Sequence, residues 1–203
     1  SHRKFARKCA LLTQGPTPPA GFLVEDLVSA GRAPYQSIFH QWRPDDERAV
    51  EAALERCAIG ALRDRDIDTL SGGQRQRAWM ALALAQDTPV MLLDEPTTFL
   101  DIAAQIELLD LAWALNRQEG RTIVVILHDL NMAARYADLV VALKDGRVVS
   151  SGTPDEVMTT ETVREIFGIE STIITDPLTA RPLVMPYSVT GSDTPIVNEL
   201  LVS

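Results

Sequence analysis

The sequence lacks any apolar run long enough to cross a lipid bilayer. A transmembrane helix needs about 18 or more consecutive apolar residues, and no stretch of the 203 residues approaches that length. The basic residues near the N-terminus are not followed by the apolar segment of a secretory signal peptide. We therefore expect a chain that does not itself enter the membrane.

Cysteine and histidine are scarce. The two cysteines, Cys9 and Cys57, are too few for a disulfide scaffold and too far apart for a zinc site, so we expect reduced thiols. The three histidines, His2, His40 and His128, are too scattered for a metal site. These absences argue against a small secreted scaffold and against a zinc module.

Positive charge is scarce too. The chain has 19 Lys and Arg against 28 Asp and Glu, a formal net charge of −9. An acidic surface repels phosphate backbones, which argues against a nucleic-acid binder, although one locally oriented site can still bind a nucleotide. An apolar fraction of 46% and a charged fraction of 23% are typical of a globular protein with one domain or two small ones.

What is present is an alternation of strands and helices, which predicts an α/β fold with a parallel sheet and helices on both faces. Val90–Leu93 and Ile123–Leu127 are continuous apolar runs, as in strands that are buried on both faces. The expected strands are Cys9–Thr13, Val90–Leu93 and Thr122–Leu127, and the expected helices are Leu23–Ala30, Pro44–Cys57, Gly72–Ala85, Ile102–Gln118 and Leu130–Tyr136.

The C-terminal part of the chain has a different pattern. Leu139–Lys144 and Arg147–Ser150 flank Asp145-Gly146, which supplies the positive φ of a tight hairpin turn. Beyond Gly168 the apolar pattern is weak. We expect the last residues, 187–203, to form a loosely held tail.

Ser71-Gly72-Gly73-Gln74 opens the helix expected at Gly72–Ala85. Two glycines allow a ligand to approach the backbone closely, and the free amides of a helix N-terminus bind anions. The same residues have the S-x-x-Q spacing of a capping box. The two interpretations are compatible, because the cap can shape the anion site.

Polar side chains also follow three expected strands. Asp94 and Glu95 follow Val90–Leu93, His128 follows Thr122–Leu127, and Gln14 follows the first strand. In open α/β sheets, ligands bind at the C-terminal ends of parallel strands. Adjacent side chains on a strand point in different directions, so Asp94 and Glu95 are expected to do different jobs, one toward a metal and one toward a reacting water. Taken singly, each could equally be a solvated strand end.

Together these motifs resemble the ABC ATPase family. The signature helix of that family resembles LSGGQRQRAWMALALAQ, its Walker B strand and D-loop resemble VMLLDEPTTFLD, its histidine switch resembles ILHDLN, and its Q-loop strand resembles ALLTQ. The resemblance covers about residues 4–186, and motifs of this combined length do not match by chance. HDLN-MAARYAD, KDGRVVSSGTPDEVMT and REIFGI are most similar to importers of iron–siderophore, haem and cobalamin.

The resemblance assigns roles to individual residues. Glu95 would be the general base that polarises the attacking water, and His128 would contact the γ-phosphate. Asp94 would hold Mg²⁺ through water. Gln14 would sense Mg²⁺ and the water, and would couple the site to the membrane subunit. Asp101 would bridge the two halves of a head-to-tail dimer.

The resemblance also implies a fold, partners and a location. The fold would be a P-loop NTPase-like parallel sheet flanked by helices, with a small helical subdomain. The protein would bind and hydrolyse ATP with Mg²⁺ as part of an importer for iron–siderophore or a related metal chelate. It would pair with a second copy and with integral membrane permease subunits on the cytoplasmic face of the cell membrane. The signature loop (Ser71, Gly72, Gly73 and Gln74) would contact the nucleotide of the partner copy. The expected domains are 1–20 with the Q-loop, 21–70 as the helical subdomain, 71–186 with the signature helix and catalytic core, and 187–203 as the tail.

The sequence departs from the family pattern in two places. Thr13 stands where the family has proline before the Q-loop glutamine. No phosphate-binding motif G-x-x-x-x-G-K-[ST] is present, because none of Lys4, Lys8 and Lys144 has the required neighbours. We therefore expect the chain as given to begin after that motif and to be inactive alone. The missing strand is expected beside the Asp94 strand, and its loss is expected to expose apolar sheet surface that a longer polypeptide or self-association would cover.

Two further questions stay open from the sequence. The chain could be a soluble ABC ATPase of DNA repair or translation, or a truncated non-enzymatic fragment. The region 21–43 could be the dock for a permease helix, or its apolar residues could be the core of the helical subdomain. These residues are Phe22, Tyr35, Ile38, Phe39 and Trp42.

Overall fold

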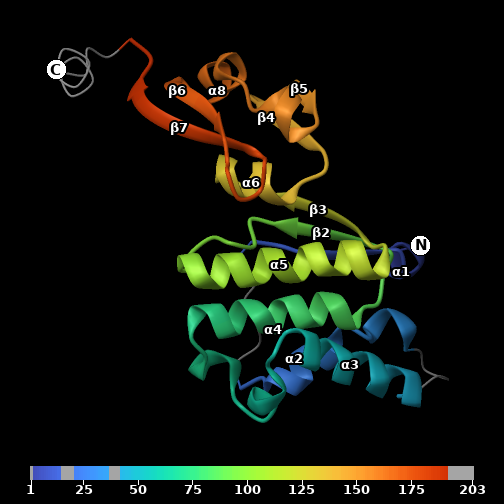
Figure 1. Ribbon diagram of the computed structural model, residues 1–203. Coiled ribbons are helices and arrows are strands. Elements are labelled where there is room, and N and C mark those ends of the chain that lie inside the picture. The colour runs from blue at the N-terminus through green and yellow to red at the C-terminus, as the bar shows by residue number, and fades with distance from the viewer. Residues whose placement is uncertain (1, 15–20, 37–41, 192–203) are drawn as a thin grey trace. The chain divides into compact units, whose positions relative to one another are not determined.

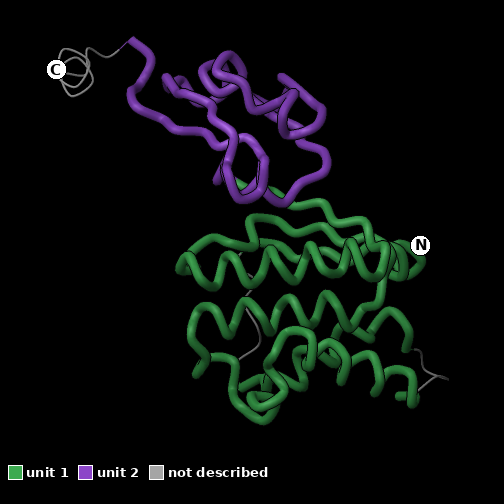
Figure 2. The backbone as a smooth tube through the Cα atoms, in the orientation of Figure 1, with its two compact units in different colours: residues 1–127 green, residues 128–203 purple. Residues whose placement is uncertain are grey.

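The structure is a computed structural model that describes residues 2–14, 21–36 and 42–191. It divides into two compact units, residues 1–127 and residues 128–203, which Figure 2 shows in different colours. Each unit is described by itself below. None of the helices in the described ranges is long and apolar enough to span a membrane.

The first unit is an α/β layer structure, as predicted (Figure 1). Its elements in chain order are α1 (His2–Ala6), β1 (Cys9–Leu12), α2 (Val24–Ala30), the 3₁₀ turn η1 (Ala33–Tyr35), α3 (Pro44–Arg56), η2 (Gly60–Leu62), η3 (Ile67–Thr69), α4 (Gly72–Ala85), β2 (Val90–Asp94), α5 (Ile102–Glu119) and β3 (Thr122–Ile126).

The three strands form a parallel sheet in the order β1-β2-β3. In this register Leu11 lies beside Leu92, and Leu92 lies beside Val124. The central strand β2 therefore has a neighbour on each side. The expectation that a further strand sits beside the Asp94 strand is wrong, because both hydrogen-bonding edges of β2 are occupied. An additional strand could join this sheet only at β1 or β3.

Helices α4 and α5 cover one face of the sheet, and α2 and α3 pack against the far side of α4 (Figure 1). Ala10, Met91 and Leu93 point into this side and are at most 1% exposed. They join side chains from α2, α3, α4 and α5 in one continuous apolar core. Burial of about 25 cal/mol per Å² of apolar surface makes this core the main source of stability in the unit.

The opposite face of the sheet is apolar and exposed. Leu11, Val124 and Ile126 are 54%, 51% and 51% exposed. The prediction that β2 and β3 are buried on both faces is therefore wrong for β3. The continuous apolar runs are real, but within the described residues only one of the two faces is covered, and parallel sheets are normally covered on both.

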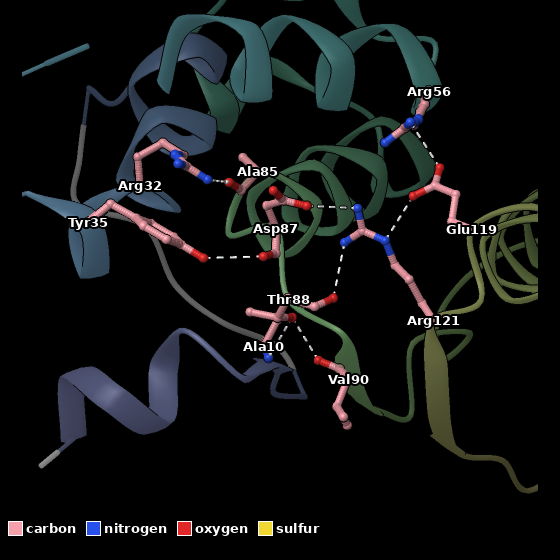
Figure 3. A network of polar contacts seen from close by, with 10 residues as sticks. All are labelled: Ala10, Arg32, Tyr35, Arg56, Ala85, Asp87, Thr88, Val90, Glu119 and Arg121. Carbon is pink, nitrogen blue, oxygen red and sulfur yellow. Dashed lines mark hydrogen bonds and ion pairs between the residues drawn. The ribbon is translucent and has the colours of Figure 1, made fainter. Parts of the chain in front are cut away.

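At the N-terminal ends of the strands, polar groups bind one another closely (Figure 3). Thr88, just before β2, accepts a hydrogen bond from Ala10 N over 3.1 Å and donates to Val90 O over 2.7 Å. Arg121, just before β3, donates to the carbonyl of Thr88 over 3.2 Å. These contacts join the starts of all three strands.

A closed series of polar contacts, here called the polar ring, begins and ends on α3. On one side, Asp46 and Arg32 form a buried ion pair at 2.8 Å, and Arg32 also donates to Ala85 O at the end of α4 over 2.8 Å. The Arg32 guanidinium lies 4.0 Å from the centre of the Tyr35 ring, whose hydroxyl donates to Asp87 O over 3.2 Å. Burial raises the pKa of the Tyr35 phenol, so it remains a donor.

The other side of the polar ring passes through Arg121 (Figure 3). Its guanidinium pairs with the side chain of Asp87 at 3.1 Å and with Glu119 at 2.9 Å. Glu119 then pairs with Arg56, near the end of α3, at 2.9 Å. The members are Asp46, Arg32, Tyr35, Asp87, Arg121, Glu119 and Arg56. The ring holds the C-terminal end of α4 between the helical part of the unit and the sheet.

The second unit contains two antiparallel hairpins and three helices among its described residues. The elements are α6 (Leu130–Tyr136), β4 (Val140–Lys144), β5 (Arg147–Gly152), α7 (Pro154–Val157), α8 (Thr160–Phe167), β6 (Ile169–Thr175) and β7 (Pro182–Val189). The β4–β5 hairpin turns at Asp145-Gly146, both with positive φ, as predicted. The β6–β7 hairpin was not predicted, and β7 continues to Val189, inside the stretch interpreted as a tail.

Candidate functional site

Helix α4 begins in a capping box at Ser71. The Ser71 hydroxyl accepts from Gln74 N over 3.3 Å, and the Gln74 side chain accepts from Ser71 N over 3.2 Å. The cap that the sequence predicts is therefore confirmed. It fixes the first turn of a 14-residue helix, whose remaining N-terminal amides belong to residues that carry almost no side chain.

The two glycines of this turn are not required by the packing of the chain. An added Cβ at Gly72 would lie 3.9 Å from Phe99 O, and one at Gly73 would lie 3.5 Å from the Cβ of Ala104. Both are ordinary contact distances, and neither glycine has positive φ. Glycine costs about 1 kcal/mol relative to alanine inside a helix. Gly72 and Gly73 therefore weaken the start of the helix, although the local packing does not require glycine. This pattern is expected where a ligand approaches the backbone.

Asp94 is the last residue of β2, and Glu95 leaves the strand with φ +47°. This left-handed conformation is strained for a residue with a side chain. It ends the strand abruptly directly after Asp94. That the two carboxylates do different jobs stays a prediction.

Gln14 reaches the same edge from β1, two residues after that strand ends. Its Nε2 donates to Glu95 Oε2 over 2.7 Å. Thr98, in the loop after β2, donates to the same oxygen over 3.1 Å. Two of the residues predicted from separate strand ends thus meet at the C-terminal edge of the sheet, as parallel topology requires.

Thr98 was missed by the analysis of the sequence. The only signal was its spacing, three residues after Glu95, because Thr98 N donates to Glu95 O in a turn over 3.2 Å. Phe99, the next residue, was also missed: it has φ +65° and is 97% exposed. Threonine and phenylalanine carry no specific sequence signal at such positions.

Asp101 caps α5, since its carboxylate accepts from Ala104 N over 2.8 Å. The side chain of Gln105 then donates back to Leu100 O over 3.0 Å and closes the loop between β2 and α5. Asp101 therefore has a structural role in this chain in addition to the contact across a dimer that the resemblance implies.

His128 lies two residues beyond the end of β3 and is the first residue of the second unit. Its neighbour Asp129 caps α6, accepting from Asn131 N and Met132 N over 2.8 and 2.9 Å. The chain thus delivers His128 directly after the C-terminal end of β3, between a strand and a capped helix. Its role stays a prediction.

The donors for a cation are few. No group of three or more His, Cys, Asp or Glu side chains that could hold a metal occurs in the part of the chain that the structure describes. Mg²⁺ in phosphate chemistry is commonly held by one or two protein carboxylates together with water and substrate phosphates. Asp94 and Gln14 carry oxygen donors of this kind, and they remain the predicted ligands.

The apolar residues considered for a permease dock have different surroundings in the structure. Phe22 packs against the core and Tyr35 belongs to the polar ring, so these two serve the helical part itself. Trp42 is 42% exposed and donates to Glu47 over 2.7 Å. Ile38 and Phe39 lie outside the described residues.

Similarity to known proteins shows the family of this chain. Residues 1–98 match the ABC transporter family. The chain is 48% identical over 192 residues to the ferric enterobactin transport ATP-binding protein FepC of Escherichia coli, a match that covers 95% of this chain and 71% of that protein. The chain belongs to the ABC transporter ATP-binding family. Members of this family hydrolyse ATP to drive transport, so the predicted family and enzyme class are confirmed.

Other proteins similar to this ABC protein belong to the same family. It is 45% identical over 197 residues to the iron(3+)-hydroxamate import ATP-binding protein FhuC of Bacillus subtilis, covering 97% of this chain and 73% of that protein. An inward-facing metal-chelate type ABC transporter has a similar fold, with a TM-score of 0.81 and 25% identity over 91% of this chain and 73% of that one. The dimeric ATP-binding cassette MJ0796, bound to ADP and phosphate, has a TM-score of 0.64 and 26% identity over 75% and 65% of the two chains.

Proposed function

We propose that this ABC protein is the ATP-hydrolysing subunit of an importer of iron–siderophore or a related metal chelate. The cargo class rests on the relatives, whose names specify ferric enterobactin and iron(3+)-hydroxamate. The hydrolytic role rests on one observation above all, the 2.7 Å contact between Gln14 and Glu95 at the C-terminal edge of the sheet.

At this edge each side chain has a specific task. Glu95 accepts the proton of the attacking water, and Asp94 and Gln14 would hold Mg²⁺, which would neutralise charge on the phosphates. His128 donates to the γ-phosphate. Phosphoryl transfer depends mostly on positioning and charge stabilisation, and these are what carboxylate, amide and imidazole groups at strand ends supply.

The signature turn serves a second copy of the chain. Ser71 and its capping partner Gln74 fix the turn, and the glycines leave its amides open to a triphosphate held by the other subunit. The dimeric form of the related cassette supports such pairing. Asp101 would contact the partner copy, and Gln14 and the helical subdomain would contact permease subunits at the cytoplasmic face of the membrane.

The 203 residues contain no G-x-x-x-x-G-K-[ST] motif. The backbone amides of that motif are the phosphate cradle, so we expect this stretch alone to bind ATP weakly and to hydrolyse none. Steady hydrolysis by the purified 203-residue chain, above a Glu95→Gln control, would contradict this expectation.

The test uses the assembled transporter, meaning the full-length ATPase with its permease in vesicles. Glu95→Gln should lower kcat at least about 100-fold, the usual contribution of a general base, while ATP binding is retained. Glu55→Gln, which removes an exposed carboxylate from α3, is the matched control and should leave kcat unchanged. Full turnover by Glu95→Gln, or transport of a labelled ferric siderophore that does not depend on ATP, would refute the proposal.

A further inference from the structure

The loop after β2 holds a hydroxyl group against the Glu95 carboxylate. Thr98 Oγ1 lies 3.1 Å and Gln14 Nε2 lies 2.7 Å from the same oxygen, Glu95 Oε2. An ionised carboxylate can only accept hydrogen bonds, so both side chains are donors. Two neutral donors from different parts of the chain thus converge on one atom of the proposed base.

The main chain fixes the position of the hydroxyl. Thr98 N donates to Glu95 O over 3.2 Å, and the overlapping turn is closed by Leu100 N donating to Thr97 O over 3.2 Å. Gln105 then anchors Leu100 O from α5. Thr98 is also β-branched and stiff at χ1. Little conformational freedom is lost when it binds the carboxylate, because the turn has already been ordered.

The two donors differ in what else they do. Gln14 has a long side chain and follows another strand, β1. In the proposed function it would also bind Mg²⁺ and respond to the permease. Thr98 lies in the same turn as Glu95. Its contact can therefore persist when the amide of Gln14 is bound elsewhere during the transport cycle.

We propose that Thr98 is a positioning residue for hydrolysis, holding the Glu95 carboxylate in the orientation from which it removes a proton from the attacking water. The inference rests on the proposed role of Glu95. As the water oxygen bonds to the γ-phosphorus, its proton passes to Glu95, the bond to the β–γ bridging oxygen breaks, and ADP leaves with that electron pair. Thr98 exchanges no atom. Its effect is on orientation, to which such reactions are sensitive.

The test compares three variants in the assembled transporter. Thr98→Val keeps the shape and removes the hydroxyl, and it should lower kcat about tenfold with the KM for ATP within about twofold. Thr98→Ser restores the hydroxyl and should keep kcat within about twofold of the wild type. Thr97→Val is the control, because Thr97 contributes its carbonyl to the turn, and it should leave kcat unchanged.

The same substitutions in a Glu95→Gln background separate the inference from the proposed function. If Thr98 acts through Glu95, Thr98→Val should change the residual rate less than about twofold there. Two results would overturn the role of Thr98 and leave that of Glu95 intact. One is an unchanged kcat when Thr98→Val is made in the wild type. The other is an equal loss of kcat when it is made in the wild type and in Glu95→Gln. A wild-type rate for Glu95→Gln alone would overturn both.

Discussion

The two ends of the parallel strands in the first unit are built differently. At the N-terminal ends, Thr88 and Arg121 bind one another and the neighbouring strand, and the polar ring surrounds the end of α4 (Figure 3). At the C-terminal ends, Glu95 and Phe99 both have positive φ. Positive φ also occurs at the N-terminal end, at Asp87. The ends differ in burial, because the contacts of Thr88 with Ala10 and Arg121 are buried, whereas Gln14 meets Glu95 in an exposed contact.

Because the polar contacts at the two strand ends differ in burial, they also differ in how much they contribute to stability. The side chains of Arg32 and Asp46 are 7% and 5% exposed, so each needs the other to remain charged away from water. At the other end, the Gln14–Glu95 contact is exposed, where hydrogen bonds contribute less to stability. The difference in burial indicates that the N-terminal end contributes more to the stability of the fold, which leaves the C-terminal end available for the proposed chemistry.

The largest expected effect comes from opening the polar ring. Arg32→Met leaves Asp46 buried without its partner and should lower the free energy of unfolding by about 3 kcal/mol, measured by urea denaturation. Arg48→Met is the control, because its pair with Asp45 is fully at the surface, and it should cost less than about 0.5 kcal/mol. Equal losses for the two variants would show that the ring adds no stability.

The next largest effect on stability is expected where the backbone at the end of α2 lies close to the backbone of α4. A Cβ on Gly31, at the end of α2, would lie 2.3 Å from the carbonyl of Leu82 in α4. Gly31→Ala should therefore destabilise the chain by about 2 kcal/mol, as overpacking does. Gly60→Ala has no atom within 4 Å of the added Cβ and should not destabilise the chain, with a gain of at most about 1 kcal/mol. A tolerated Gly31→Ala would contradict the tight packing of α2 on α4.

Cys57 should make the free energy of unfolding depend on pH. It follows Arg56, where the polar ring returns to α3, and burial raises the pKa of its thiol from 9.0 to about 12. The folded chain thus retains a proton that the unfolded chain loses, so this contribution to stability is complete below pH 9 and declines as pH rises toward 12. Relative to Cys57→Ala, the wild type should lose about 1.4 kcal/mol between pH 8 and pH 10 in urea unfolding. A constant difference across that range would contradict a buried, protonated thiol.

The sequence predicted what depends on local pattern. Helix α4 begins and ends where its apolar period and Ser71 cap indicate, and the meeting of Gln14 with Glu95 follows from parallel topology. The family motifs predicted which residues form the site, and the roles of these residues stay predictions.

What depends on distant partners could not be predicted. Arg32 and Arg121 look like ordinary surface arginines in the sequence, because nothing local shows that Asp46 and Asp87 will meet them. The β6–β7 hairpin was missed because its strands alternate only weakly between apolar and polar residues. The neighbours of β2 are set by sheet order, which strand composition does not encode.

The smallest expected effect is on stability at the catalytic end. Glu95→Gln retains an oxygen that can accept from Thr98 and Gln14, and it leaves the positive φ unchanged. The free energy of unfolding of the 203-residue chain should therefore change by less than about 0.5 kcal/mol, although the same substitution is expected to stop turnover in the assembled transporter. A loss above about 1.5 kcal/mol would mean that this end also stabilises the fold. The division of labour between the two strand ends would then fail, because the residue proposed for chemistry would be as necessary for folding as Arg32.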